Sequence, residues 1–499
     1  MKRHVKTDFI VYFRKFMYIR VDSSCHSYQF MIPLLMQINS IGGVFMSQQQ
    51  QELSRGLESR HITLMSLGAA IGVGLFLGSA GAIKLAGPAI LITYALGGAV
   101  IFLIMRALGE LAADYPVAGS FSRYAHQYLG PLAGFLTGWN YWFLWIVTGM
   151  AEITAVGIYM QYWFPDSPKW LWALAALVIM TFVNLIAAKA FGEFEFWFAL
   201  IKIIAIIAMI ILGLAVILFG FSNDGVALGF SNLWSHGGFM PNGFSGVISA
   251  LPIVMFAYLG VEMIGVTAGE AKNPKLVIPK AINTVLMRIL IFYIGALLVI
   301  MSVYPWDQIS PENSPFVLMF DNVGIRYAAG IINFVVLTAA LSSCNSGIFS
   351  TGRMLFNLSD QQQAPRFFGK VSHSGVPRNA ILVSSFVLLI GVALNYFVDE
   401  KVFTYVTSVS TFGAVFTWVI ILITQLRFRK TQSKEAAKKL TFPMIWYPVS
   451  SYIAILFLVF VVVLMAFNAD TRIALIVGPI WLVLLLVLYF SYYKNRLSK

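Results

Sequence analysis

The chain has 499 residues, of which 59% are hydrophobic and only 11% are charged, and its mean hydropathy is +0.80. This composition excludes a soluble globular protein and indicates an integral membrane protein. The net charge of +13 is compatible with a nucleic-acid partner, so the positions of the basic residues have to decide between nucleic-acid binding and membrane topology.

Residues 1–45 come first and differ from the rest of the chain. They are basic at the start, and the moderately apolar run at residues 30–45 is short and interrupted by polar residues and a proline. A signal peptide has a cleaner apolar run followed by a small-residue cleavage site, and we find neither in residues 1–45. We expect a cytoplasmic tail at residues 1–60 with a dispensable extension at 1–45, a transmembrane domain at 61–493, and a cytoplasmic C-terminal tail at 494–499.

Apolar stretches of about 20 residues, long enough to cross a hydrocarbon core of about 30 Å, recur from residue 62 onward. We count about twelve, which predicts an all-α integral membrane fold. The predicted spans are residues 62–83, 88–112, 132–164, 170–190, 196–220, 244–268, 281–304, 327–350, 379–397, 402–426, 447–467 and 473–493.

Basic residues cluster in alternate loops, after the sixth, eighth and tenth predicted spans. They are Lys272, Lys275 and Lys280, then Arg353, Arg366, Lys370 and Arg378, then Arg427, Arg429, Lys430, Lys434, Lys438 and Lys439. Residues 222–243 have no Lys or Arg, and the charged residues within 307–325 are all acidic. By the positive-inside rule the basic loops face the cytoplasm, and so do both termini. The positive charge therefore reflects topology, and we expect no nucleic-acid partner.

Two spans contain helix-breaking sequences at bilayer depth. The first span reads Gly68-Ala-Ala-Ile-Gly72-Val-Gly74, and the sixth contains Pro252 followed by Phe256-Ala-Tyr-Leu-Gly260. Backbone that leaves the helix inside hydrocarbon must face protein or a water-filled cavity. Corresponding breaks in the two halves of a transporter indicate an inverted repeat with a midplane site. We predict a five-plus-five inverted repeat with broken helices 1 and 6, followed by two additional spans.

The two breaks suit an amino acid zwitterion. Exposed N–H groups at residues 68–74 suit a carboxylate, and freed carbonyls near Phe256 and Ala257 suit an ammonium. The alternative is that the glycines only permit close helix packing, but three glycines within seven residues, matched by a second break, favour a site. The predicted substrate-binding residues are Ala70, Ile71, Gly72, Val73, Gly74, Phe256, Ala257, Tyr258 and Gly260.

One basic and three acidic side chains within the spans are further candidates. Lys202 lies inside the fifth span, where an ionisable residue indicates function, although a structural lysine paired with a carbonyl is the alternative. Glu262 follows the second break and is expected to brace the first span or cap the turn. Glu152 and Glu110 are gate members or interhelical anchors, and for Glu110 we favour an anchor.

The sequence lacks the motifs of other functional classes. Cys25 and Cys344 are too far apart to indicate a disulfide framework, and there is no HExxH, paired CxxC or GxxxxGK[ST] motif. We therefore predict no metal, no cofactor and no ATPase activity. The paired helix breaks argue against a channel. A membrane enzyme would need a group of catalytic side chains, and none of the six histidines lies well inside a span, which argues against an enzyme.

Several strings resemble the amino acid permease group of the amino acid/polyamine/organocation (APC) superfamily over residues 50–495. They are Arg55-Gly-Leu-Glu-Ser-Arg-His61, residues 68–76, Arg106-Ala-Leu-Gly-Glu110, Gly192-Glu-Phe-Glu-Phe-Trp197, residues 256–262 and Ala268-Gly-Glu-Ala-Lys-Asn-Pro274. Residues 287–306 are similar to proline-specific permeases. Residues 141–143, 147–150 and 345–350 are similar to D-serine/D-alanine/glycine permeases.

The resemblance implies a secondary transporter that imports amino acids across the bacterial cytoplasmic (inner) membrane. It implies proton symport of small neutral amino acids, either proline or alanine, serine and glycine. An exchanger, or a permease for aromatic or other amino acids, is the alternative. It further implies that Lys202, standing where sodium-coupled relatives bind their ion, couples transport to protons, and that Phe256 closes over the substrate. The expected partners are the amino acid, the proton and the lipid bilayer, with no obligatory protein partner.

Overall fold

The computed structural model describes residues 71–117, 119–186, 188–221, 225–267, 273–310, 314–322, 326–372, 375–398 and 401–494. The chain divides into two units, Met1–Glu52 and Leu53–Lys499, and every described residue belongs to the second. Both predicted tails, apart from Lys494, and the proposed extension at residues 1–45 therefore lie outside the described residues, as does Ala70.

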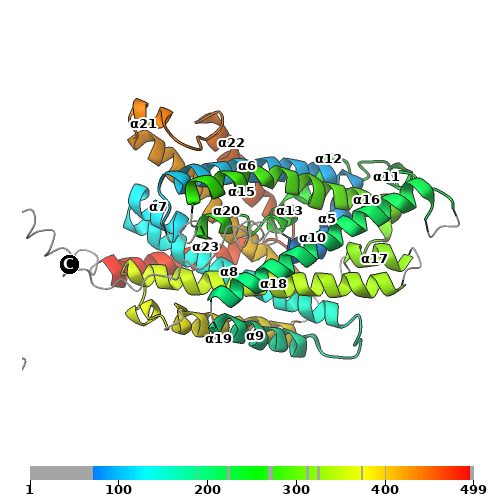
Figure 1. Cartoon of the computed structure of the whole chain (residues 1–499), viewed down its shortest axis with the longest axis horizontal. Helices are drawn as coiled ribbons and strands as arrows, with labels where there is room; N and C mark the ends of the chain where they lie inside the picture. Colours follow the sequence, from blue (N-terminus) through cyan, green and yellow to red (C-terminus); the bar gives the residue numbers. More distant parts are fainter. Residues whose placement is uncertain are drawn as a thin grey trace, which may run out of the picture. The chain divides into compact units, whose positions relative to one another are not determined.

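All regular elements of the described residues are helices, joined by loops and single turns (Figure 1). They are α4 (Val73–Phe76), α5 (Gly78–Ala86), α6 (Ile90–Asp114), α7 (Ser120–Leu129), α8 (Pro131–Met160), α9 (Lys169–Ile186), α10 (Ala188–Phe219), α11 (Asn232–Ser235), α12 (Gly243–Ser249), α13 (Leu251–Ala257), α14 (Met263–Thr267), α15 (Pro274–Arg288), α16 (Ala296–Val303), α17 (Pro315–Asn322), α18 (Arg326–Asp360), α19 (Arg378–Phe397), α20 (Val402–Thr431), α21 (Lys434–Lys438), α22 (Val449–Met465) and α23 (Ala474–Leu488). A π-helical segment, Ile289–Gly295, joins α15 to α16, and another, Tyr489–Tyr493, continues α23.

Each of the twelve predicted spans overlaps at least one of these helices. Within the described residues, nine helical stretches are long and apolar enough to cross a membrane, and two shorter apolar ones, Gly243–Ala257 and Val449–Met465, fall in the sixth and eleventh predicted spans. Large apolar side chains lie exposed on the outer helices, as Phe386 of α19 does at 73% exposure, which suits a surface that faces lipid. The prediction of an all-α multi-span membrane fold is confirmed.

Some predicted span boundaries are wrong. Helix α10 begins eight residues before the predicted span, and α18 continues to Asp360. Arg353, which we expected in a cytoplasmic loop, is therefore helical and buried, with its guanidinium carbon 3.2 Å from the centre of the Phe349 ring. The helix continues because its last turns still pack on α8, where a Cβ on Gly138 would lie 2.6 Å from Leu358.

Helices α8 and α18 pack against each other and form the most buried part of the bundle. Of their most apolar stretches, 83% and 78% respectively are buried, against 28% for α9. Small residues allow the close approach, since a Cβ on Gly347 of α18 would lie 3.0 Å from the Trp145 ring of α8. A buried, tightly packed pair of helices gives the two broken spans a rigid surface to lie against.

Both predicted breaks contain non-helical backbone in the described residues. Gly72 is extended (φ −121°, ψ −163°), and α4 begins at the next residue. Helix α13 ends at Ala257, and residues 258–262 form a turn with Gly260 at φ +99°, a conformation that favours glycine. Helices α4 and α13 pack together, which brings the two breaks side by side. The inverted repeat itself stays a prediction.

Glu110 ties three segments together near one end of the bundle. Its buried carboxylate on α6 accepts a hydrogen bond from Gln425 of α20 (2.9 Å) and from the backbone N–H of Met444, and it lies 2.8 Å from Nε of Arg429. Both oxygens are engaged, a contact pattern that suits the interhelical anchor we favoured from the sequence, and that role stays a prediction.

We expect Glu110→Ala to lower the free energy of unfolding by about 3–5 kcal/mol, because it strands a partly buried guanidinium. Thermal unfolding of the purified protein in detergent, followed by tryptophan fluorescence, measures the loss. Asp360→Ala is the matched control, since its ion pair with Arg123 (3.3 Å) is about 40% exposed on both sides and should contribute less than about 1 kcal/mol. Equal melting of the two variants would contradict the anchor role.

Candidate functional site

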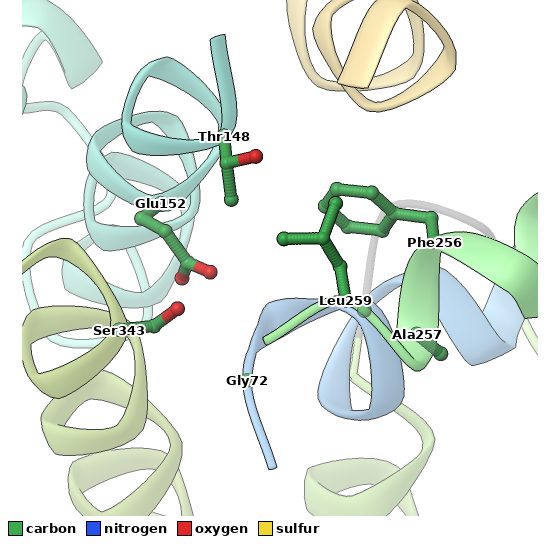
Figure 2. Close-up of a pocket in the computed structure, with 8 residues that line it drawn as sticks. Gly72, Thr148, Glu152, Phe256, Ala257, Leu259 and Ser343 are labelled. Carbon is green, nitrogen blue, oxygen red and sulfur yellow. The ribbon is translucent and has the colours of Figure 1, made fainter. Parts of the chain in front are cut away.

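A small pocket lies where the two breaks meet the central helix pair (Figure 2). Helices α8 and α18 form one side of the pocket. The other side is formed by the start of α4 and by the end of α13 with the turn that follows it. The residues that line it are Gly72, Gly74, Thr148, Glu152, Phe256, Ala257, Leu259 and Ser343. In Figure 2 Glu152 and Ser343 point toward each other, and Phe256 and Leu259 face them across the pocket.

One wall of the pocket is polar. The Glu152 carboxylate interacts with the side chain of Ser343 and with the backbone N–H of Val73, the first residue of α4. Its Oε2 atom has no hydrogen-bond partner in the described part of the chain, although the residue is only 2% exposed. One turn earlier on α8, Thr148 donates to the carbonyl of Leu144 (2.8 Å). This wall therefore offers a buried carboxylate oxygen with capacity to accept a proton or an N–H donor.

The opposite wall is apolar and belongs to the second break. The Phe256 ring is almost fully buried and stands edge-on to Phe403 of α20, with 6.5 Å between ring centres. The Phe256 carbonyl accepts from the N–H of Leu259 (3.0 Å), and the Ala257 carbonyl accepts from the hydroxyl of Tyr293 (2.9 Å). We expected these two carbonyls to be free for an ammonium, but each already has a donor from the protein.

Leu259 lines the pocket, but the predicted site residues in the turn at 258–262 make their contacts outside it. Tyr258 donates its hydroxyl to the carbonyl of Tyr94 (2.7 Å) and packs with Tyr94 and Tyr293. The N–H of Gly260 donates to Glu262 (3.2 Å), whose buried carboxylate also lies beside Tyr141 and Trp418. Glu262 thus caps the turn, which is one of the two roles we considered, and neither Tyr258 nor Gly260 lines the pocket.

Lys202 lies directly behind the first break. Its Nζ donates to the carbonyl of Ile71 (3.2 Å) and to the hydroxyl of Ser342 (3.0 Å), and the side chain is fully buried. Ile71 contributes its carbonyl to this contact rather than a side chain to the pocket. The lysine therefore binds the backbone carbonyl immediately before the extended residue Gly72.

Besides Arg353, sequence analysis missed two further buried charged residues. Glu195 of α10 is fully buried and accepts a hydrogen bond from Ser342 (2.7 Å), and Arg288 of α15 is buried and donates to the carbonyl of Ala281 (3.3 Å). Glu195 stands one residue outside the predicted fifth span. Its spacing of seven residues from Lys202 places both on one helix face and is the signal that could have found it.

The family profile described as "Amino acid permease" matches residues 61–499. The chain belongs to the amino acid permease family. The permease is thus a membrane transporter of amino acids and not an enzyme.

Three relatives from Bacillus subtilis (strain 168) align with most of the permease. "Uncharacterized amino acid permease YtnA" is 65% identical over 446 residues, which cover 89% of this chain and 96% of the relative. "Probable threonine/serine transporter YbxG" is 53% identical over 442 residues (89% and 96%), and "Amino-acid permease AapA" is 53% identical over 441 residues (88% and 95%). The resemblance to the family is confirmed, while the narrower resemblance to proline or D-serine permeases stays a prediction.

The pocket of the permease depends on the lack of a side chain at Gly74. A Cβ there would lie 2.6 Å from the Cα of Ala257, a backbone atom that moves only if α13 moves. We expect Gly74→Ala to abolish amino acid uptake and to lower the free energy of unfolding by about 1–3 kcal/mol. Gly78→Ala in α5 is the matched control, because its Cβ would meet no atom closer than 3.8 Å. Uptake at the wild-type rate by Gly74→Ala would show that the breaks need not touch.

Proposed function

We propose that the permease imports small neutral amino acids, with serine, threonine, alanine, glycine and proline as the candidate substrates, by symport with protons across the bacterial cytoplasmic membrane. The observation that carries the proposal is the pocket between the two helix breaks, backed by the buried Lys202. Discontinuous helices in transporters place backbone groups against charged substrates near the bilayer midplane.

The head group of an amino acid fits the polar side of the pocket. The unpartnered Oε2 of Glu152 is a suitable acceptor for the substrate ammonium. The N–H groups at Gly72–Gly74 suit the substrate carboxylate. Because Glu152 itself interacts with the Val73 N–H, we propose that an incoming carboxylate takes over this donor. The ammonium position differs from the one we expected at the Phe256 and Ala257 carbonyls, which the protein already uses.

The other lining residues favour a short side chain. Phe256 and Leu259 fill the apolar wall and leave little depth, whereas the hydroxyl groups of Thr148 and Ser343 suit a substrate hydroxyl. A relative 53% identical to this chain carries the name "Probable threonine/serine transporter". Both observations support small substrates over the alternative of aromatic ones.

The proposed orientation places both termini in the cytoplasm. Helices α7 and α21 lie at one end of the bundle in Figure 1, and α11 and α17 lie at the other. The lysines of α21 follow the basic end of α20, whereas Asp307 stands between α16 and α17. Under the positive-inside rule, the α21 end faces the cytoplasm.

Lys202 is the proposed proton-coupling residue. Burial disfavours a charged lysine, and its charged form donates to the Ile71 carbonyl, so a change in its protonation acts directly on the first break. We expect Lys202→Ala in proteoliposomes to retain counterflow of labelled serine but to lose accumulation driven by an inward pH gradient. The gradient can support about tenfold accumulation per pH unit in the wild type. If Lys202→Ala accumulates serine with wild-type pH dependence, the coupling role belongs to another residue.

Gly72 tests the substrate site separately from coupling. A Cβ at Gly72 would lie 3.3 Å from both the Glu152 carboxylate and the Ser343 hydroxyl, so a leucine side chain would fill the polar side of the pocket. We expect Gly72→Leu to abolish both counterflow and accumulation while the protein still inserts and purifies as a folded monodisperse species. A panel of labelled amino acids, each with and without a pH gradient, identifies the substrates and separates symport from exchange.

A further inference from the structure

A directed hydrogen-bond chain connects Lys202 to a second acidic residue. Lys202 Nζ donates to Ser342 Oγ at 3.0 Å, and the same hydroxyl donates to Oε1 of Glu195 at 2.7 Å. All three side chains are fully buried. Each donor therefore faces the next acceptor, which is the arrangement along which a proton can pass without bulk water.

The groups around this chain are polar, and its charges do not balance. Glu152 approaches Lys202 from α8, while Ser346 and Asn345 of α18 lie beside Glu195. Asn345 in turn accepts from Asn184 of α9 (2.7 Å). If Glu152, Glu195 and Lys202 were all ionised, the cluster would carry a net charge of −1 in a dry interior, which is costly. One further proton on a carboxyl group makes the cluster neutral.

Glu195 and Glu152 lie on different sides of the lysine. Glu152 lines the pocket. Glu195 is seven residues nearer the start of α10, about 10 Å along the helix axis. In the proposed orientation the start of α10 faces the cytoplasm. The cluster thus has one carboxylate toward the substrate and one toward the proton's destination.

We propose that Glu195 is the cytoplasmic-side proton acceptor of the transport cycle and receives, through Ser342, the proton that Lys202 carries. The inference rests on the proton coupling at Lys202 proposed above. In the transfer, an ammonium proton passes to Ser342 Oγ while the hydroxyl proton of Ser342 passes to Glu195 Oε1. The products are a neutral amine, an unchanged serine and a neutral carboxylic acid, so protons and charge are conserved. Glu195 then releases the proton to cytoplasmic water in the inward-open state.

The experiment separates the proton pathway from transport itself. Proteoliposomes containing the full chain are assayed with labelled L-serine and L-threonine in two ways. Counterflow, with substrate on both sides and no gradient, needs no net proton movement. Accumulation against a concentration gradient, driven by an inward pH gradient, needs proton release.

Four variants are compared with the wild type. Ser342→Ala removes the bridging hydroxyl, Ser342→Thr keeps it, and Glu195→Gln keeps the acceptor shape without a titratable group. Thr351→Ala is the matched control, because Thr351 is buried on the same helix but donates to the carbonyl of Ile348 in its own turn (2.9 Å).

We expect Ser342→Ala and Glu195→Gln to retain counterflow within about twofold and to lose at least tenfold in pH-driven accumulation. Ser342→Thr and Thr351→Ala should behave like the wild type. Wild-type accumulation by Glu195→Gln would falsify the proposal, and so would an equal loss of counterflow and accumulation, which indicates a structural role. A wild-type protein that shows counterflow without pH-driven accumulation would instead overturn the proposed symport, and one without counterflow of either amino acid would overturn the proposed substrates.

Discussion

The constraint on which the whole structure depends is that backbone outside a helix must find hydrogen-bond partners inside a membrane. In the described part of this bundle, side chains supply them. Lys202 binds the carbonyl of Ile71, and Glu152 interacts with the N–H of Val73 at the first break. At the second break the hydroxyl of Tyr293 binds the carbonyl of Ala257, and Glu262 accepts from Gly260. Three of these four partners are a lysine and two glutamates, all buried, so the residues that bind the broken backbone are also ones that can carry the charge that the proposed coupling requires.

Because of this double role, protonation and substrate binding can both change the hydrogen bonds of the broken backbone. A partner that loses or gains a proton changes the strength of its bond to the broken backbone, and in the binding mode proposed above a substrate carboxylate competes with Glu152 for the N–H of Val73. A ligand shifts a conformational equilibrium only by its differential interaction with the two states. Under the proposed mechanism the differential interaction is exchanged at the breaks themselves, which links substrate binding directly to the contact between α4 and α13.

Much of this architecture could be predicted from the sequence, and the reasons are local. Length and hydropathy locate the spans, and the glycines at positions 68–74 and the break after Phe256 locate the pocket. What hydropathy hides is charge at the ends of spans, because a window that maximises apolarity assigns charged residues to loops. Glu195 and Arg353 were placed outside the helices for that reason, although neighbouring helices bury both. The bond from Tyr293 to Ala257 depends on how two segments 36 residues apart pack, which no local pattern encodes.

The buried carboxylates differ in whether both of their oxygen atoms have hydrogen-bond partners. Both oxygens of Glu110 are engaged, by Gln425, Arg429 and a backbone N–H, so it has no capacity to exchange a partner without breaking an anchor. Glu152, Glu195 and Glu262 each have one carboxylate oxygen without a hydrogen-bond partner in the described residues. A buried acceptor left open is costly in a purely structural site, which supports the proposal that the substrate ammonium approaches Oε2 of Glu152. Under the proposals above, the two carboxylates nearest Lys202 take part in transport, whereas the contacts of Glu110 suit a residue of the scaffold.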